Sequence, residues 1–543
     1  MGYKKYALAL LTIATLGMVG CDDGSDGATG PAGAAGADGA AGADGAAGAA
    51  GPQGPAGPSS SNLQVVADRI FTEANDLRGM TYATSAAQAG KIYVSGHVGL
   101  DDASRQVVVG RLFADGSPDT TFGGDGFVEL EATTEEGSND ETSLGVVELP
   151  SGDVVVAVNA VDDAAGGRSV YLMRLEADGT QTVGWGDAMG KVEVPFGYAN
   201  ADNATFPGAP AAAPEDFVWD LQRDPSVTED RVVVFGYGPA RDAVRTDRDR
   251  YIARMNISDT GAMPDPMFNG GEAFTYFVPG DFSDNQRRGI VEADGKIVGA
   301  GYTNLGDDAV TGDPIRHHVM AIRLNEDGTF DTTFAGYSDE ALVPTQGGLT
   351  AFNPFQVDGG FAEAYAVGLQ QGTSSYVLAG YGGVTATGAP STLGYISTIK
   401  QDVVAFRTST GNSASEDTSW GNDGNIAIQS EGLGNPDTED RARHMVVLPD
   451  DRTLITGLFG DVPAAFMLTA DGMPDTSIFG TGIIELADPD PSTVVVDAGG
   501  VDDDYEFFSV AQNSSNSDAV RVAMGSNERD AGARVVVLQI ATE

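Results

Sequence analysis

The chain has 543 residues, and its 79 acidic against 30 basic side chains give a formal net charge of −49 at pH 7. Nucleic acid and anionic lipid both repel such a charge, so the composition excludes unaided binding to either. Hydrophobic residues make up 41% of the chain, which is enough for a substantial core and excludes global disorder.

The N-terminus has the pattern of an export signal. Lys4 and Lys5 precede the apolar stretch 7–20, and Cys21, the only cysteine, follows. The stretch is too short to span a bilayer, which needs roughly 20 residues. The run Met18-Val19-Gly20-Cys21 resembles the lipobox of bacterial lipoproteins, although Met18 stands where Leu is usual. The resemblance implies a signal peptide at 1–20 and a lipid on Cys21 that anchors the exported chain at the outer membrane or cell surface; a plain secretory signal is the alternative.

The next segment, 21–61, contains a glycine at every third position from Gly24 to Gly57. This period resembles the Gly-X-Y pattern of bacterial collagen-like stalks, in which only glycine fits at the axis of three chains. The segment holds few prolines, and its aspartates would align and repel one another in a trimer. Two interpretations stay open, a flexible spacer and a homotrimeric stalk.

From residue 62 onward the sequence repeats. The clearest marker, Arg111–Gly123, reads R-L-F-A-D-G-S-P-D-T-T-F-G, and related markers begin at Arg174 and Arg323. In these three copies an aromatic residue lies seven positions after the first Asp of the marker. A fixed spacing predicts a fixed local conformation in every copy.

Each copy divides into four strand-like runs. In the fourth copy these are 287–292, 296–301, 316–324 and 340–344. Repeats of four short strands separated by turns predict propeller blades, which we place near 80–131, 144–195, 217–278, 287–344, 362–429 and 442–487.

A seventh blade begins near residue 505 but provides only three runs before the chain ends. The run 63–70 has no partner of its own and would complete that blade, which closes the ring and protects two open edges. The sequence therefore predicts an all-β fold, a seven-bladed β-propeller of four-stranded antiparallel blades over 62–543, closed by an N-terminal strand. The marker also resembles the delta-60 repeat of bacterial surface and secreted proteins. That resemblance implies a propeller at the cell surface and provides no catalytic residues.

Two sets of repeated residues are candidates for chemistry. One aromatic per copy predicts wedges packed between blades, or alternatively a ligand-stacking ring: Phe122, Trp185, Phe268, Phe334, Trp420 and Phe479. Paired aspartates with intervening carbonyls are oxygen ligands that suit calcium, although turn capping explains them better: Asp115, Asp119, Asp327, Asp331, Asp471 and Asp475. No other cofactor is indicated.

Motifs for catalysis are absent from the sequence. The four histidines (His97, His317, His318 and His444) lack zinc-site spacing, and there is neither a Gly-x-Ser-x-Gly elbow nor a phosphate-binding loop. The connections between repeats vary instead, which is typical of binding loops: 196–216, 237–248, 302–315, 345–361, 381–401, 430–441 and 488–504. They carry aromatic and cationic residues: Tyr198, Phe206, Arg241, Arg245, Tyr302, Phe352, Phe355, Tyr381 and Tyr395.

These observations predict a lipid-anchored cell-envelope protein whose propeller binds a protein, glycan or matrix partner without catalysis. The first alternative is an exported hydrolase or lyase, assisted by calcium. The second is a trimeric collagen-like stalk with a propeller head.

Overall fold

The computed structural model describes residues 62–542 with internal gaps, so the predicted signal peptide, Cys21 and the Gly-X-Y segment lie outside the described residues. The gaps are 100–104, 134–139, 163–166, 195, 197–215, 240–247, 272–273, 278–283, 305–316, 335–336, 339–346, 353–360, 384–401, 410–416, 423, 429–439, 461, 487–505, 514–518 and 527–531.

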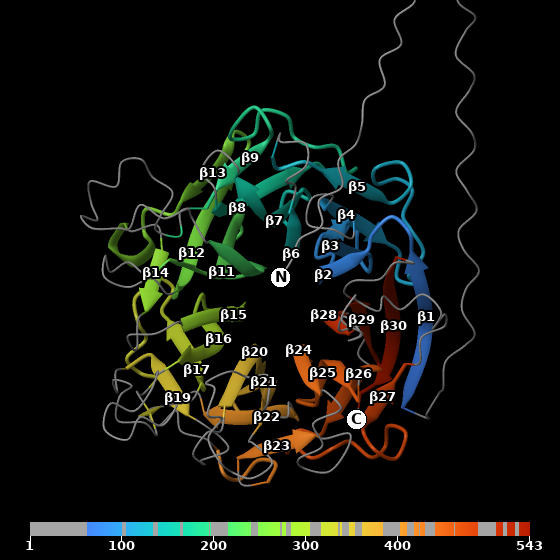
Figure 1. The fold of residues 1–543 in the computed structure, drawn as a ribbon, viewed down its shortest axis with the longest axis vertical. Helices are drawn as coiled ribbons and strands as arrows, with labels where there is room; N and C mark the ends of the chain where they lie inside the picture. The colour runs from blue at the N-terminus through green and yellow to red at the C-terminus, as the bar shows by residue number, and fades with distance from the viewer. Residues whose placement is uncertain are drawn as a thin grey trace, which may run out of the picture. The chain divides into compact units, whose positions relative to one another are not determined.

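The strands form seven separate antiparallel sheets arranged as propeller blades (Figure 1). The first blade contains β2 (Asp76–Tyr82), β3 (Ile92–Val98), β4 (Gln106–Leu112) and β5 (Phe127–Leu130). The second contains β6 (Thr142–Glu148), β7 (Val154–Asp162), β8 (Gly167–Leu175) and β9 (Lys191–Glu193). The third contains β10 (Phe217–Arg223), β11 (Arg231–Pro239), β12 (Arg248–Ser258), β13 (Gly261–Pro264) and β14 (Phe274–Phe277), with the short 3₁₀ helix η2 (Phe268–Gly271) before β14.

In each of the remaining blades the first strand given is again the innermost. The fourth contains β15 (Asp284–Val291), β16 (Ile297–Asn304), β17 (His317–Leu324), β18 (Tyr337–Ser338) and β19 (Leu349–Phe352). The fifth contains β20 (Phe361–Gln370), β21 (Ser375–Gly383), β22 (Asp402–Ser409) and β23 (Asn425–Ile428). The sixth contains β24 (Arg441–Val447), β25 (Thr453–Phe459), β26 (Val462–Leu468) and β27 (Ile483–Glu485). The seventh contains β28 (Phe507–Asn513), β29 (Ala519–Ser526), β30 (Ala533–Ala541) and β1 (Leu63–Phe71).

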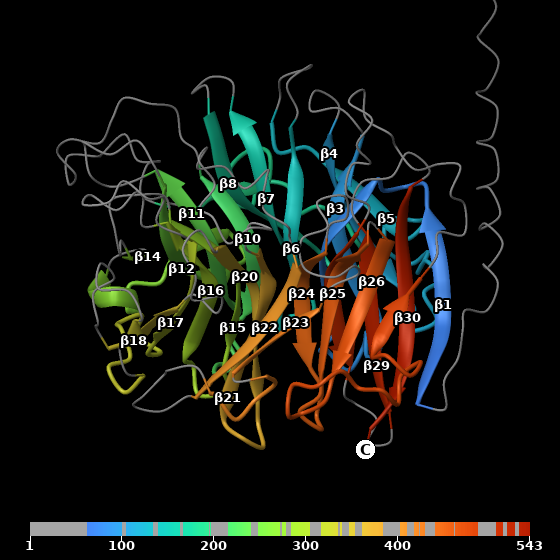
Figure 2. The same cartoon turned by 60° about the horizontal axis from the view of Figure 1, so that its bottom comes forward.

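The N-terminal strand completes the last blade, as the sequence predicted. β1 pairs antiparallel with β30, from Leu63 opposite Ile540 to Phe71 opposite Ala533. Figures 1 and 2 show the two strands side by side at the outer edge of the blade. Because the two ends of the repeat array share one sheet, β30 is not left as an open edge. The prediction of an all-β, seven-bladed propeller is confirmed.

The blades pack face to face, and the apolar core lies between them. One buried cluster combines Leu454 and Met467 of the sixth blade with Val522 and Leu538 of the seventh. The innermost strands also contact one another around the whole ring, in the order β2, β6, β10, β15, β20, β24, β28 and back to β2. Within the described part of the chain, no helix is long and apolar enough to cross a membrane.

The fourth blade departs from the strand boundaries expected from sequence. Its fourth full strand is β19, Leu349–Phe352, which pairs with β17, whereas the expected run 340–344 lies outside the described residues. Tyr337 and Ser338 of β18 add a short parallel pairing to β19.

Candidate functional site

The seven innermost strands surround a central channel, and every one of them contains a β-bulge near its start. In six blades a single residue is skipped by the pairing with the second strand, and in the fourth blade two are skipped. These bulge residues are Arg78, Leu144, Trp219, Arg287 with Arg288, Tyr365, Arg443 and Phe508. A bulge changes the direction of its side chain relative to the pleat. We call this set the bulge ring.

Glycines in the second strand of five blades explain why the bulges form where they do in those blades. A Cβ on Gly96 would lie 1.8 Å from the carbonyl oxygen of Asp76, and one on Gly380 would lie 1.8 Å from that of Glu363. Corresponding glycines at 236, 301 and 457 face the same carbonyl of their own blades at 1.9–2.1 Å. Only glycine allows this close approach of two backbones, so in these five blades the glycine fixes the position from which the bulge projects. In the second and seventh blades Val158 and Ser526 stand at the matching register position.

Five bulge residues from different blades contact one another across the channel. Trp219 stacks on Phe508, with ring centroids 6.1 Å apart, and meets Tyr365 edge-on at 5.6 Å. The Arg287 guanidinium lies 4.0 Å from the Trp219 ring centroid, and that of Arg443 lies 4.8 Å from the Tyr365 ring centroid. Alternating cations and aromatic faces stabilise the ring through cation–π attraction.

Two glutamates balance the charges of these arginines. Glu506 accepts a hydrogen bond from Arg443 Nε at 2.7 Å, and Glu363 Oε2 lies 3.5 Å from Arg287 Nη2. Burial disfavours the charged forms of both arginines, but the surrounding carboxylate and phenol groups outweigh it and raise the pKa of each guanidinium. Both arginines therefore remain cations throughout the physiological pH range.

Arg288 closes the channel at the level of the bulge ring. It belongs to β15, but its Nη2 donates to the carbonyl oxygens of Arg78 at 2.9 Å and Phe508 at 3.1 Å, in strands β2 and β28 on the other side of the ring. Asp220 Oδ1 lies 3.8 Å from Arg288 Nη1. Burial lowers the pKa of Arg288 to about 10, against the raising effect of Asp220. The guanidinium is still charged at neutral pH.

An aromatic patch extends the bulge ring toward the face where the innermost strands begin, which we call the start face. Phe217 contacts Trp219 at 5.3 Å between ring centroids and stacks on Tyr237 at 5.4 Å, with the latter two planes 10° apart. Arg168 lies 5.5 Å above Phe217, and Arg248 lies 4.9 Å above Tyr237. Phe217 and Trp219 are partly exposed and Arg248 is exposed. We call these five residues the start-face patch.

The predicted binding loops lie almost entirely outside the described residues, including Tyr198, Phe206, Arg241, Arg245, Phe355 and Tyr395. Tyr302 and Tyr381 are described, but the structure places them inside strands β16 and β21 rather than in loops. Both are buried next to the bulge ring, where Tyr302 accepts a hydrogen bond from Asn285 and Tyr381 donates to Glu363 at 3.4 Å. Phe352 lies in β19.

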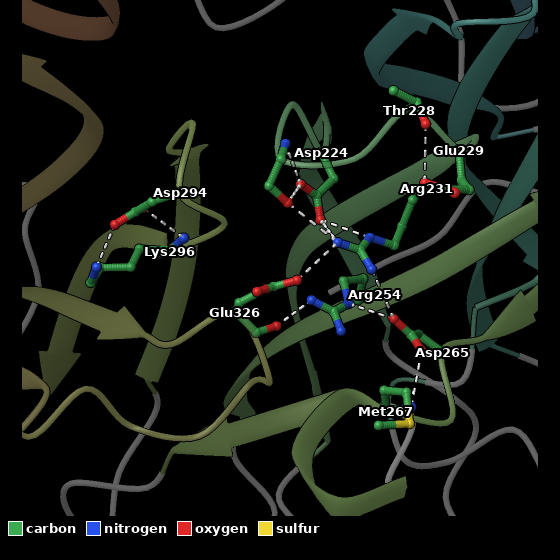
Figure 3. Close-up of polar contacts among 11 residues, drawn as sticks. Asp224, Thr228, Glu229, Arg231, Arg254, Asp265, Met267, Asp294, Lys296 and Glu326 are labelled. Carbon is green, nitrogen blue, oxygen red and sulfur yellow. Dashed lines mark hydrogen bonds and ion pairs between the residues drawn. The ribbon is translucent and has the colours of Figure 1, made fainter.

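The repeated marker forms a joint between neighbouring blades, as Figure 3 shows for the third and fourth blades. Arg254 Nε lies 2.8 Å from Asp265 Oδ2 of its own blade, and its Nη1 donates to the backbone carbonyl of Glu326 in the next blade. The guanidinium also lies 4.8 Å from the Phe268 ring centroid. Arg111 repeats the arrangement with Asp119, Phe122 and the Ala177 carbonyl.

The aromatic wedges are confirmed in five of the six copies and wrong in one. Phe122, Trp185, Phe268, Phe334 and Trp420 are fully buried at blade boundaries. In the sixth blade Ile478 is fully buried, whereas Phe479 is partly exposed and has a φ of 50°. Ile478 lies seven residues after Asp471, so the spacing of the marker rather than the aromatic character identifies the wedge.

The calcium candidates accept hydrogen bonds within the protein. Asp115 and Asp327 accept from the N–H and hydroxyl groups of Ser117 and Thr329, two positions later in each turn. Three others are paired with arginine: Asp119 with Arg111, Asp331 with Arg323, and Asp475 with Arg452. Asp471 is exposed. No group of three or more metal-ligating side chains occurs in the described ranges.

Sequence reasoning missed the bulge ring, although the sequence contains a signal for it. The repeats keep an acidic residue at or just before the start of the innermost strands, for example Asp76, Glu363 and Glu506. Two or three positions later, at the bulge, the residue type varies from blade to blade. A position that varies inside a regular repeat is not fixed by the packing that all blades share. Here it holds Arg78, Tyr365 and Phe508.

Comparison with known proteins gives a partial family match. Residues 90–122 match the model of a domain of unknown function (DUF5122) beta-propeller, and no curated protein matches the chain. Among solved structures, a protein of unknown function from Dyadobacter fermentans is 12% identical, with 88% of this chain and 100% of that chain covered and a TM-score of 0.37. The alpha-L-arabinofuranosidase Arb93A from Fusarium graminearum is 8% identical (89% and 98% covered, TM-score 0.37), and Drosophila Plexin A in complex with Semaphorin 1b is 9% identical (89% and 88%, 0.36). Likenesses this weak carry no functional argument, so what these findings establish is a β-propeller domain of unknown function.

Proposed function

We propose that the chain is an exported, lipid-anchored envelope protein of the delta-60 repeat type, and that its propeller binds a protein, glycan or matrix partner at the start face. The observation that carries this proposal is the start-face patch, where the partly exposed rings of Phe217 and Trp219 join the buried Tyr237 to the bulge ring in one chain of aromatic contacts. Aromatic residues and arginine are the side chains most enriched where proteins bind partners. Their contact with one another also keeps the patch rigid before a partner binds.

Binding rather than catalysis fits the chemistry of this region. Arg287 of the bulge ring is paired with Glu363, and Arg443 with Glu506. His97 of the first blade is buried, with its Nδ1 3.1 Å from the Thr142 hydroxyl. Burial lowers the pKa of His97 well below its ordinary value, so it is neutral at pH 7. An exported hydrolase or lyase is the alternative, and broad glycosidase and esterase screens test it.

The binding experiment uses the chain with Cys21→Ser, which cannot be acylated, on arrays of envelope polysaccharides and purified envelope proteins. Trp219→Ala and Phe217→Ala should weaken binding to any partner found by about tenfold or more, because each removes a stacked ring. Phe113→Ala is the matched control, since Phe113 is 41% exposed but belongs to a marker turn. Equal losses for Phe113→Ala and Trp219→Ala would contradict the proposed site, and silence on every array would contradict the proposed function.

The anchor and the tether are tested separately. Metabolic labelling with an alkyne fatty acid should mark the wild-type chain and not Cys21→Ser, and fractionation should move the variant from the membrane to the soluble fraction. A collagen-type circular dichroism signal with a trimeric mass would favour the stalk, whereas a monomer without that signal would favour the flexible spacer.

A further inference from the structure

A cavity of about 950 Å³ occupies the central channel on the other side of the bulge ring from the start face. Its wall is built from the later part of all seven innermost strands and reaches the turns that follow them, such as Ala293–Asp294 and Leu448–Pro449. Arg288 spans the channel at the inner end, so the cavity is closed there. Its volume lies in the range of sites for small molecules.

Buried polar atoms along the cavity have no hydrogen-bond partner in the described protein. They are Arg288 Nε and the Tyr82 hydroxyl, which can donate, and Gln512 Oε1, which can accept. All three side chains line the cavity. A buried polar group without a partner costs free energy. Each of these atoms exposes less than 1 Å² of surface, so a ligand would relieve this cost only where the side chain turns toward the cavity.

His444 adds a further donor near the closed end. Its Nδ1 accepts a hydrogen bond from the Val510 N–H at 3.1 Å, so in the neutral ring the proton must be on Nε2. Burial, and next the charge of Arg288, lower the pKa of His444 well below its ordinary value. The imidazole is therefore a neutral donor at pH 7.

The rest of the wall selects the body and the charge of a ligand. Aliphatic residues such as Val146, Leu369 and Val446 line it. The positive charge of Arg288 is already balanced by Asp220 at 3.8 Å, and Glu292 and Asp294 lie toward the turns. An anion would meet these carboxylates and the large negative charge of the chain without gaining an unbalanced cation.

We propose that this cavity, separate from the start-face patch, is a binding site for a small uncharged amphiphile with an aliphatic body and a carbonyl or amide head directed at Arg288 and His444. The aliphatic body replaces water against the apolar wall. The head accepts hydrogen bonds from His444 Nε2 and, once its side chain turns toward the cavity, from Arg288 Nε, which has no partner among the described residues.

The test uses the non-acylated Cys21→Ser chain and the neutral fluorescent probe N-phenyl-1-naphthylamine. We expect saturable fluorescence enhancement with one probe per chain, and displacement by octanamide at a concentration at least tenfold lower than by octanoate. Thr81→Phe, at a partly exposed position of the cavity wall, should weaken probe binding at least tenfold. Val183→Phe is the control, because Val183 is 83% exposed.

Two results with the chain that carries the unaltered cavity would overturn the proposal: a probe fluorescence that does not saturate, or equal displacement of the probe by octanamide and octanoate. If Thr81→Phe binds the probe with unchanged affinity, the probe does not bind in this cavity. If Thr81→Phe does not fold, as judged by circular dichroism, the comparison of the two competitors still decides. Because start-face binding is measured with other probes, failure here leaves that function standing.

Discussion

Replacement of Arg254 by methionine should destabilise the propeller far more than removal of an exposed cation in the same region. Arg254 is 2% exposed and holds Asp265, itself 3% exposed, at 2.8 Å. Methionine keeps most of the packing volume against Phe268 but removes the charge and the hydrogen bond to the Glu326 carbonyl. Asp265 would then keep the hydrogen bond from the Met267 N–H at 2.9 Å, and its nearest remaining cation would be Arg231, at 3.6 Å.

The expected cost is about 3 kcal/mol, at the lower end of the range for breaking a buried ion pair, because Arg231 still offsets part of the charge left on Asp265. Lys296→Met provides the control shown in the same view (Figure 3). The Lys296 and Asp294 side chains are 33% and 54% exposed, and an exposed pair of this kind contributes less than about 1 kcal/mol.

Urea denaturation followed by tryptophan fluorescence measures both variants. The double variant Arg254→Met/Asp265→Leu should recover at least half of the loss, because no unpaired charge then remains in the joint. If Arg254→Met and Lys296→Met shift the urea midpoint equally, or if the double variant is less stable than Arg254→Met, the marker arginine does not act as a buried joint.

Three further predictions concern the marker and its wedges. Trp185→Phe should lower the free energy of unfolding by about 1 kcal/mol, because it removes the hydrogen bond from Trp185 Nε1 to the Ser258 carbonyl at 2.7 Å. Trp219 Nε1 has no partner in the described protein, so Trp219→Phe should lower the free energy of unfolding by less in the same urea titration. Addition of EDTA or calcium should leave the melting temperature unchanged, since the marker aspartates already accept hydrogen bonds; a large rise with calcium would identify them as metal sites. The Thr329 hydroxyl and N–H hold the pKa of Asp327 below its usual range, so Thr329→Val should be less stable than wild type above about pH 4. That difference should vanish as the pH falls through the folded-state pKa, and a difference that persists at pH 2 would show that Asp327 ionisation is not its cause.

The repeat pattern was sufficient to predict the ring because each copy carries its own turn and wedge. The Asp-Gly turn, the marker arginine and a residue seven positions after Asp recur with fixed spacing in the three clear copies, and local chemistry fixes them there. The error at Phe479 arose because an aromatic residue was sought, whereas burial follows the spacing and selects Ile478. The closing strand was predictable because the run 63–70 and the incomplete last blade each lacked a pairing partner, and pairing with each other completes one four-stranded blade.

The candidate site was harder to predict because its residues come from different blades and share no motif. Trp219, Arg287 and Phe508 are far apart in sequence and meet only when the ring closes. Tyr302 and Tyr381 were assigned to variable loops because they begin the connections 302–315 and 381–401, which vary between repeats. The structure shows that the strands continue through both residues, and that Gly301 and Gly380 beside them make the close backbone contacts opposite the bulges.

Within each repeat, the residues that join the blades are separate from the residue at the bulge, and this separation explains how one scaffold can carry a specific site. The marker joins a blade to its neighbour through Arg254, Asp265 and Phe268 or their counterparts, so the ring keeps its geometry whatever residue occupies the bulge. In five blades the glycine opposite the bulge requires only that the extra residue leave the pleat, and places no demand on its side chain. Seven positions can therefore change without disturbing the joints. In this chain they provide the cations and aromatic rings that close the channel and separate a start-face patch from a closed cavity.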